Sequence, residues 1–215
     1  MLAEHRIPPA NGGAPGHAVI ILHGLGDSGA GGLLEIGRIW SASLPDAEFL
    51  CPDAPFPFEG APFGRQWFSL ADMAMPAMLR GAKTAAPYLD RYIDHILASR
   101  KLPPQKLALA GFSQGTIMAL YTGLRRPQPI AGILGYSGIL VGAETLAVEK
   151  KGGPPVLLVH GTMDEVVPYG YQEMSAEGLR RAGIPVDCIS RPGLGHGIDD
   201  VGIAEGLRFL RQIFS

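Results

Sequence analysis

Short apolar runs alternate along this chain with longer segments of helical period, and this alternation limits the folds open to it. The predicted strands are Ala18–His23, Ala47–Cys51, Lys106–Phe112, Ile130–Tyr136, Pro155–His160 and Val186–Arg191. Several are continuously apolar, which is typical of strands that helices cover on both faces. The predicted helices are Gly31–Ser41, Ala82–Ser99, Gln114–Leu124, Tyr171–Ala182 and Asp199–Phe214. The pattern predicts an α/β fold with a mostly parallel central sheet and helices on both faces.

The length of the chain sets the number of domains. With 215 residues it can bury one sizeable core but falls short of two average domains. We therefore expect a single domain over residues 1–215, in which residues 1–16, rich in proline and glycine, form a loose lead-in. Charged residues make up 18% of the chain, the formal net charge is -2, and there is no long basic run. Nucleic acid is therefore not an expected partner.

Hydropathy and cysteine usage bear on the compartment. No apolar run approaches the roughly 20 residues that span a bilayer, so we expect no stable membrane insertion. Cys51 and Cys188 lie in apolar segments without the close spacing of metal or redox motifs, and we expect them to be reduced core thiols. The first residues lack the basic start and apolar stretch of a signal peptide. Together these features predict a cytoplasmic protein.

The most informative motif is Gly-Phe-Ser-Gln-Gly at residues 111–115, between a predicted strand and a predicted helix. In that setting G-x-S-x-G is typical of a sharp, strained turn that exposes a nucleophilic serine, here Ser113. Glycine is needed on both sides because the strand and the helix pass too close for side chains. The pentapeptide alone is a weak signal, and its structural alternative is an ordinary serine in a tight turn.

A serine hydroxyl needs a base, and the base needs a carboxylate to orient it. On a strand, turn and helix of this kind, the acid and then the histidine follow the serine along the chain. Of the six histidines only His196 follows the last predicted strand. Asp164 stands four residues past the strand that ends at His160, and Glu165 is its rival. We favour Asp164 because Val-Val-Pro at residues 166–168 indicates an inward turn.

Acyl transfer also needs two N–H donors aimed at the oxygen that becomes negative in the tetrahedral intermediate. One is usually the backbone N–H of the residue after the nucleophile, which here is Gln114. The other usually comes from a glycine-rich loop after an early strand. In this chain that loop begins after the first long apolar strand, and we choose Leu25 as the second donor.

The same loop also fits a hypothesis that places the chain in another class of protein. Gly24, Gly26 and Gly29 have the spacing of a dinucleotide-binding fingerprint, and Asp53 lies at the end of the next predicted strand. A dinucleotide-binding protein is therefore an alternative. It gives no reason for the serine motif, the acid and the histidine that follow later in the required order.

Several stretches together point to a known family. They are residues 22–29 (LHGLGDSG), 52–55 (PDAP), 66–68 (QWF), 111–115 (GFSQG), 160–164 (HGTMD) with 166–168 (VVP), and 195–196 (GH). In this order they resemble the phospholipase/carboxylesterase family of small α/β hydrolases, which includes acyl-protein thioesterases and bacterial carboxylesterases. The resemblance implies the α/β-hydrolase fold, the triad Ser113, Asp164 and His196, an oxyanion hole formed by Leu25 and Gln114, and no cofactor.

The predicted reaction is hydrolysis of a carboxylic ester through an acyl-enzyme on Ser113, with acyl-protein thioesterase or lysophospholipase as alternatives that the same triad would serve. We expect a small-molecule acyl ester or thioester as substrate, with Trp67 and Val167 in contact with it. Little chain is left for a large cap domain. Ser69 departs from the family, whose members usually carry Asp there, and this bears on substrate preference. Members are often dimeric, so a homodimer is an open expectation.

Overall fold

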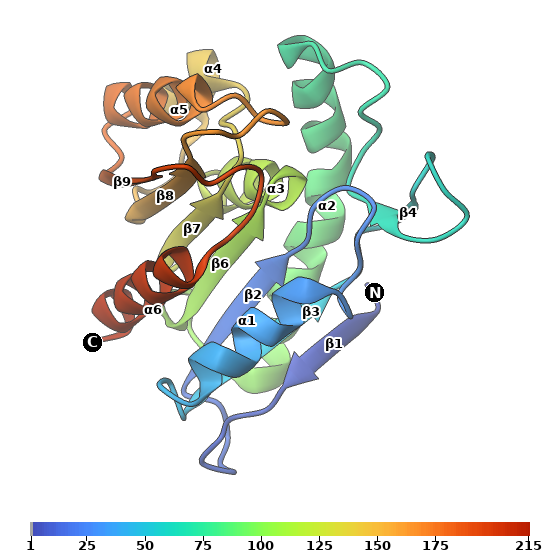
Figure 1. Cartoon of the computed structure of the whole chain (residues 1–215). Helices are drawn as coiled ribbons and strands as arrows, with labels where there is room; N and C mark the ends of the chain where they lie inside the picture. The colour runs from blue at the N-terminus through green and yellow to red at the C-terminus, as the bar shows by residue number, and fades with distance from the viewer. Residues whose placement is uncertain (1) are drawn as a thin grey trace.

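One seven-stranded sheet organises the chain, whose residues 2–215 are described by a computed structural model (Figure 1). The strands lie in the order β1-β3-β2-β6-β7-β8-β9, and only the pair β1 and β3 is antiparallel. Their bounds are β1 (Glu4–Ile7), β2 (His17–Leu22), β3 (Ala47–Pro52), β6 (Leu107–Phe112), β7 (Gly132–Tyr136), β8 (Val156–Gly161) and β9 (Val186–Arg191). The carboxyl ends of the six parallel strands therefore share one edge of the sheet.

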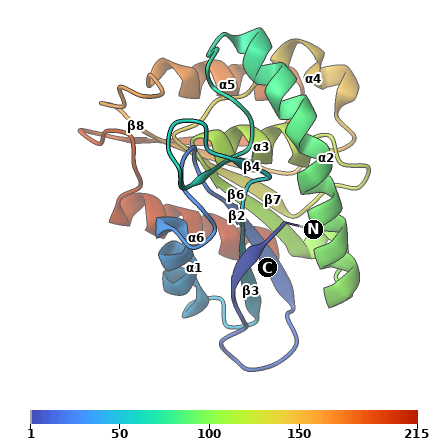
Figure 2. The ribbon, with the colours of Figure 1, turned by 90° about the vertical axis from the view of Figure 1, so that its right-hand side faces the viewer.

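Helices cover both faces of this sheet (Figure 2). One layer holds α1 (Gly32–Ser41) and α6 (Asp200–Phe214). The opposite layer holds α2 (Met75–Arg100), α3 (Gln114–Gly123), α4 (Ala143–Glu149) and α5 (Gly170–Arg181). This layering is the α/β architecture that the alternation of apolar runs and helical segments predicted.

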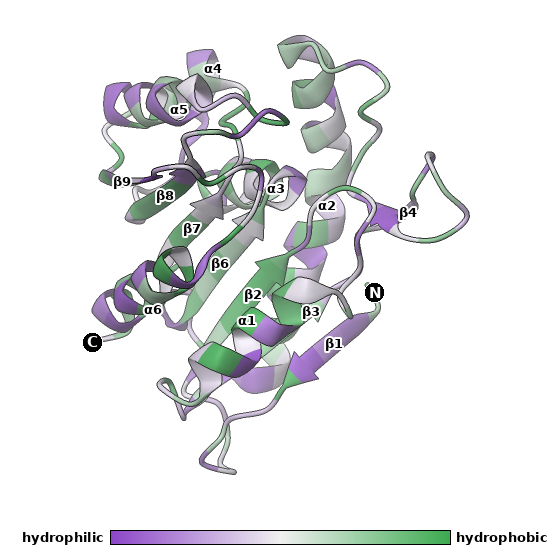
Figure 3. Ribbon diagram, viewed as in Figure 1, coloured by the Kyte–Doolittle hydropathy of each residue, from purple (hydrophilic) through white to green (hydrophobic). Residues whose placement is uncertain are grey.

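Consecutive residues of a central strand enter two different hydrophobic cores. In β2, Val19 and Ile21 belong to the core with α1 and α6, whereas Ile20 and Leu22 belong to the core with α2 and α3. All four side chains are buried, so the strand has no polar face. This explains why the predicted strands read as continuous apolar runs. Figure 3 shows the result: the central strands are hydrophobic, and hydrophilic residues gather on the helices and on β1.

The predicted elements agree closely with the observed ones. All six predicted strands are present within two residues of their predicted limits, and so are four of the five predicted helices. Gly183, which follows α5 and its cap Ala182, has the positive φ of 68° that a helix C-terminus favours. Asp199 caps α6, because its side chain accepts a hydrogen bond of 2.8 Å from the Gly202 N–H.

The prediction of a loose lead-in over residues 1–16 was wrong for Glu4–Ile7, which form β1 on the edge of the sheet. The error has a physical reason, since the first three residues of this strand are polar and exposed and carry no apolar signal. These residues are held in place by side chains that lie far along the chain. Arg6 pairs with Glu48 at 3.5 Å, and the carboxylate of Glu4 accepts a hydrogen bond from the Tyr92 hydroxyl. A short, charged strand also suits an exposed sheet edge.

Other elements were missed because they lack a periodic pattern. The helix α2 begins at Met75, well before the predicted start at Ala82, and Pro76 fits its first turn because that position needs no N–H donor. The hairpin strands β4 (Phe56–Pro57) and β5 (Arg65–Gln66) have two residues each, and α4 has seven. Between Leu2 and Ser215, no helix is long and apolar enough to cross a membrane.

The two cysteines are free thiols in different surroundings. Cys51 is buried as predicted, and burial raises the pKa of its thiol to about 12. Cys188 is only half-buried, so the prediction of a core thiol was wrong for this residue. It lies on β9, the edge strand at the far end of the sheet, where only β8 flanks it. An edge strand is covered less completely than the central strands that the apolar pattern describes.

A buried ion pair joins β3 to the end of α2. The side chain of Glu48 is 3% exposed, and both of its oxygens accept hydrogen bonds from Arg100, at 2.8 Å from Nε and 3.1 Å from Nη2. This hydrogen bonding raises the pKa of Arg100 above its ordinary value. A carboxylate buried to this extent destabilises the fold if its charged partner is removed.

We expect Arg100→Leu to lower the free energy of unfolding by about 3 kcal/mol, because it leaves the Glu48 charge buried without its main partner. The double variant Glu48→Leu/Arg100→Leu removes both charges and should be less destabilised. Urea unfolding at neutral pH measures both variants against the wild type. A double variant less stable than Arg100→Leu would contradict this account.

Candidate active site

The serine motif forms the predicted turn between β6 and α3. Ser113 precedes the first residue of α3 and has φ 54° and ψ -116°, a strained conformation for a residue with a side chain. A Cβ added to Gly111 would lie 2.4 Å from the Gly115 carbonyl oxygen, and one added to Gly115 would lie 2.0 Å from the Leu22 carbonyl oxygen. The prediction that glycine is required at both positions is therefore confirmed.

Thr116 holds this turn from inside the fold, although no sequence motif points to it. Its hydroxyl oxygen lies 2.7 Å from the carbonyl oxygen of Gly111 and 2.8 Å from that of Tyr136. The Ser113 N–H donates to the same Tyr136 oxygen at 2.9 Å. The turn is thus tied to the ends of both β6 and β7, which holds the serine in its strained backbone conformation.

Asp164 lies in the turn after β8 and its side chain is fully buried. One carboxylate oxygen, Oδ1, accepts hydrogen bonds from the N–H groups of Val166 at 3.0 Å and Val167 at 2.8 Å. The other, Oδ2, lies 2.8 Å from Nδ1 of His196. Burial acts to raise the pKa of Asp164, but the hydrogen bonds from His196 and the two amides together hold it below the ordinary value. The rival Glu165 is exposed.

The loop after β9 carries His196 to the same edge of the sheet. The Met163 N–H donates to the Leu194 carbonyl at 2.9 Å, which joins this loop to the acid turn. The imidazole ring of His196 packs against the ring of Phe112, with centroids 4.8 Å apart. The imidazole of His196 therefore lies against the residue that immediately precedes Ser113 in the chain.

The glycine-rich loop after β2 approaches the serine from the other side. A Cβ on Gly24 would lie 3.5 Å from the Ser113 Cβ, so Leu25 follows a residue in contact with the serine. Gln114 is the first residue of α3, so its N–H has no acceptor within the helix. The oxyanion role of the Leu25 and Gln114 N–H groups stays a prediction.

His23 supports the glycine-rich loop from beneath. Its Nδ1 lies 2.7 Å from the Gly24 carbonyl oxygen, and its Nε2 lies 3.0 Å from the Ala54 N–H. The amide can only donate, so Nε2 accepts and Nδ1 carries the hydrogen, which fixes one neutral tautomer. Burial lowers the pKa of His23 below 6.5, although the bond to Gly24 opposes this effect.

Trp67 and the Gln114 side chain form a second support. Trp67 is fully buried, its indole N–H donates to the His23 carbonyl at 3.1 Å, and its backbone N–H donates to Oε1 of Gln114 at 2.8 Å. Nε2 of Gln114 donates to the Phe68 carbonyl at 2.8 Å. Trp67 therefore presents no side-chain surface for the substrate contact expected of it, whereas Val167 is half-buried beside Asp164.

Two glycine amides of this loop have partners within the protein, which bears on the hypothesis of dinucleotide binding. The Gly26 N–H donates to the Arg65 carbonyl at 2.9 Å, and the Gly29 N–H donates to Oδ1 of Asp53 at 2.8 Å. A pyrophosphate would need such N–H groups free and pointing at it. The Asp53 carboxylate, which would bind the ribose of a dinucleotide, accepts this hydrogen bond from the loop. This hydrogen bonding speaks against a dinucleotide on the loop.

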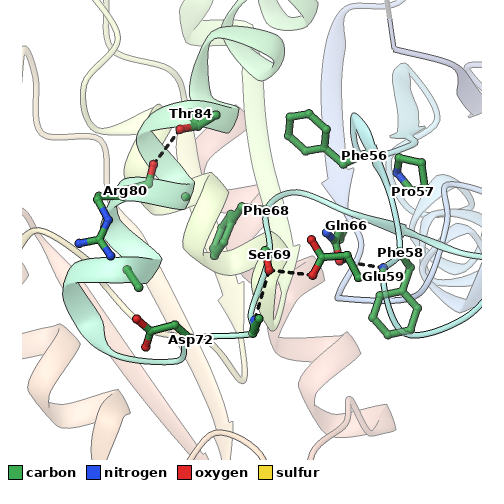
Figure 4. Close-up of a pocket in the computed structure, with 13 residues that line it drawn as sticks. Phe56, Pro57, Phe58, Glu59, Gln66, Phe68, Ser69, Asp72, Arg80 and Thr84 are labelled. Atoms are coloured by element: carbon green, nitrogen blue, oxygen red, sulfur yellow. Dashed lines mark hydrogen bonds between the residues drawn. The ribbon is translucent and has the colours of Figure 1, made fainter.

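A hollow of about 730 Å³ lies between the β4–β5 hairpin and the first half of α2, and its lining does not include Ser113, Asp164 or His196 (Figure 4). Figure 4 shows Phe68 and Ser69 on the segment that crosses it. The hydroxyl of Ser69 donates to Glu59 at 2.7 Å. Phe68 connects the hollow to Gln114, because its carbonyl accepts from the Gln114 side chain.

A helix that starts at a serine, with the acid and the histidine on the loops of the strands that follow, is the arrangement of the α/β hydrolases, and this is the class that the fold defines. A family model described as Phospholipase/Carboxylesterase matches residues 10–214. The chain belongs to the phospholipase/carboxylesterase family, as the resemblance of its motifs implied.

Known proteins agree with this assignment. The crystal structure of esterase PE8 is similar with a TM-score of 0.94 and 40% identity, covering 99% of both chains. Acyl-protein thioesterase 2 of Zea mays has a TM-score of 0.76 and 25% identity, covering 100% of both chains. Acyl-protein thioesterase 1 of Schizosaccharomyces pombe is 32% identical over 206 residues, which cover 91% of this chain and 90% of its own.

The close approach at Gly115 predicts a steric effect. We expect Gly115→Ala to lower the free energy of unfolding by about 1–3 kcal/mol, because the added methyl group would meet the Leu22 carbonyl and force the backbone apart. Gly32→Ala is the matched control, since Gly32 also opens a helix and has nothing within 4 Å of an added Cβ. Thermal unfolding compares the two variants, and equal stability would contradict the steric explanation.

The neutral His23 predicts a dependence of stability on pH. Its folded pKa lies below 6.5, so as pH falls through that value the unfolded chain takes up a proton that the folded chain resists. Stability from this group is present above pH 6.5 and is lost below it. The stability gap between wild type and His23→Phe should therefore shrink between about pH 7.5 and about pH 5. Urea unfolding across this range tests it, and a constant gap would refute it.

Proposed function

We propose that this protein is a serine carboxylesterase that hydrolyses acyl esters through an acyl-enzyme on Ser113. The observation that carries the proposal is the hydrogen bond of 2.8 Å between Asp164 and His196, made beside the strained turn that presents Ser113. A carboxylate that orients an imidazole next to a serine supplies the base that a weak hydroxyl nucleophile requires.

The first half of the proposed reaction forms the acyl-enzyme. Because Nδ1 of His196 donates to Asp164, Nε2 is left to accept the proton of the Ser113 hydroxyl. The serine oxygen then attacks the ester carbonyl, and the N–H groups of Leu25 and Gln114 stabilise the resulting oxyanion. The N-terminus of α3 adds its positive dipole at this point. His196 passes the proton to the leaving alcohol as the ester bond breaks.

The second half of the reaction releases the acid. His196 removes a proton from water, the hydroxide attacks the acyl-enzyme, and the proton returns to the Ser113 oxygen. Asp164 stays ionised throughout, which fits the lowering of its pKa, and it stabilises the imidazolium that forms twice in the cycle. These steps use only groups of the chain and water, so the proposal includes no cofactor.

Exposed apolar side chains next to the site support an acyl substrate. Leu25, which carries a proposed oxyanion N–H, is 37% exposed, and Met163 and Val166 on either side of Asp164 are more than 60% exposed. Apolar surface at the rim of a site is available to the acyl part of a substrate. In this proposal Val167 contacts the substrate, and Trp67 acts through His23 and Gln114, which its two N–H groups bind.

Thioester hydrolysis is a second candidate, and the names of the relatives favour it. Acyl-protein thioesterase 1 of Schizosaccharomyces pombe matches in sequence over 90% of its length, and acyl-protein thioesterase 2 of Zea mays matches in fold over its whole length. The proposed steps are unchanged when a thiol replaces the alcohol as leaving group. A lysophospholipid would likewise differ from a simple ester only in the group that leaves.

Turnover of p-nitrophenyl esters from acetate to palmitate, and of matching acyl thioesters, tests the proposal. We expect wild type to hydrolyse esters and Ser113→Ala to lose about 10⁴-fold or more in kcat while it remains folded. The ratio of ester to thioester turnover separates carboxylesterase from thioesterase. Full activity in Ser113→Ala would overturn the assignment of the nucleophile.

Ser137→Ala is the matched control in this experiment. Ser137 also follows a parallel strand, β7, and also has a positive φ, of 45°. It is buried, and its hydroxyl has no hydrogen-bond partner within residues 2–215. We expect Ser137→Ala to keep most of the wild-type turnover. Loss of activity in Ser137→Ala and not in Ser113→Ala would indicate that Ser137 is the nucleophile.

A further inference from the structure

A second histidine lies at the buried acid. His160 is the penultimate residue of β8 and is 2% exposed. Its Nε2 lies 2.8 Å from the carbonyl oxygen of Val167 and 3.3 Å from Oδ2 of Asp164. His196 reaches the same Oδ2 atom at 2.8 Å. One oxygen of the Asp164 carboxylate therefore lies beside two imidazole nitrogens. One belongs to His160 at the end of β8, and the other belongs to His196 in the loop after β9.

The partner of His160 determines where its hydrogen sits. A backbone carbonyl oxygen only accepts hydrogen bonds, so Nε2 of His160 must carry the hydrogen and donate it to Val167. The same N–H lies next to the Asp164 carboxylate, and the negative charge of the carboxylate attracts the partial positive charge of the N–H hydrogen. His160 thus acts on the acid turn as a donor.

Val167 links this donor to the carboxylate. Its carbonyl oxygen accepts from His160, and its N–H donates to Oδ1 of Asp164 at 2.8 Å. The remainder of the turn offers little packing, because Glu165 and Val166 are exposed. The position of the Asp164 carboxylate therefore depends on hydrogen bonds that start from the end of β8, a strand that is paired on both sides, with β7 and with β9.

We propose that His160 is a positioning residue, which holds the Asp164 turn through Val167 and thereby sets the orientation of His196. This inference rests on the proposed function, because it assigns His160 a part in the same reaction. His160 does not reach the substrate, since it is buried behind the carboxylate. Because Asp164 is itself fully buried, water cannot take over the role of a lost donor.

Two substitutions separate the donor from the shape of the ring. His160→Phe keeps a ring of similar size but removes the N–H, and His160→Gln places an amide donor near the position of Nε2. With a p-nitrophenyl ester we expect kcat of His160→Phe to fall about 10–100-fold, because a displaced carboxylate misorients the base. We expect KM to change less than about threefold, since substrate contacts remain, and His160→Gln to regain most of the loss in kcat.

His17→Phe is the matched control. His17 also lies beside an aspartate, with Nδ1 at 3.0 Å from Oδ2 of Asp46, but it stands at the start of β2, at the opposite end of the strands from the site. The same change of residue type there should leave kcat as it is. A fall in kcat for His17→Phe as large as that for His160→Phe would show a general effect of stability and overturn the proposal.

Ser113→Ala in the same assay separates this inference from the proposed function. If Ser113→Ala loses activity but folded His160→Phe matches the wild type, the serine mechanism stands and the role of His160 falls. If His160→Gln is folded and as impaired as His160→Phe, ring shape and not hydrogen bonding is responsible, which also overturns the proposal. Full activity in Ser113→Ala would instead overturn the proposed function.

A measurement on the wild-type protein covers the case in which His160→Phe does not fold. Nitrogen-15 NMR of the histidine rings reports which nitrogen carries hydrogen. We expect Nε2 of His160 to be protonated and its hydrogen to couple across the bond to the Val167 carbonyl. A His160 ring with hydrogen on Nδ1 alone would overturn the proposal without reference to activity.

Discussion

The site depends first on the contact between the start of α3 and the end of β2. The Leu22 carbonyl leaves room only for a hydrogen atom on Gly115, so the helix begins directly against the neighbouring strand. Leu22 is also the last residue of β2, after which the chain turns into the loop that carries Leu25. One close packing of backbone on backbone therefore brings together the serine turn, the helix N-terminus and the glycine-rich loop. Each of these would be displaced if the helix moved away from the strand.

The other half of the site depends on hydrogen bonds between loops. The loops after β8 and β9 meet so closely that a Cβ on Gly161 would lie 2.3 Å from the Leu194 carbonyl oxygen. Asp199, which caps α6, also binds the side chain of Arg191 at the end of β9, at 2.9 Å from Nη2. The His196 loop is thus fixed at both ends, by the acid turn and by the helix that follows it. In this arrangement the Asp164 carboxylate is buried, and the His196 imidazole is 18% exposed.

Much of this could be predicted from local sequence. The serine motif, the order of acid and histidine, and the strands and helices around them each leave a pattern within a few residues, and parallel strands bring their carboxyl ends to one edge. What could not be predicted depends on partners far apart in the chain. Gln114 binds Trp67 across 47 residues, and Trp67, expected at the substrate, proves to be buried by that contact. The polar strand β1 has no apolar pattern, and its pairing with β3 reveals it.

The parallel pairing of β2 with β6 also sets when the site can exist. Ala18 lies opposite Leu107, so nearly ninety residues must be synthesised before β2 gains its second neighbour. Contacts between residues so far apart form late, because the intervening chain must first be ordered. The serine turn is closed by Leu22 and so cannot form on an N-terminal fragment, and the histidine arrives from the last strand of all. In the proposed mechanism, the three residues of the triad therefore cannot come together until the chain beyond β9 has been synthesised.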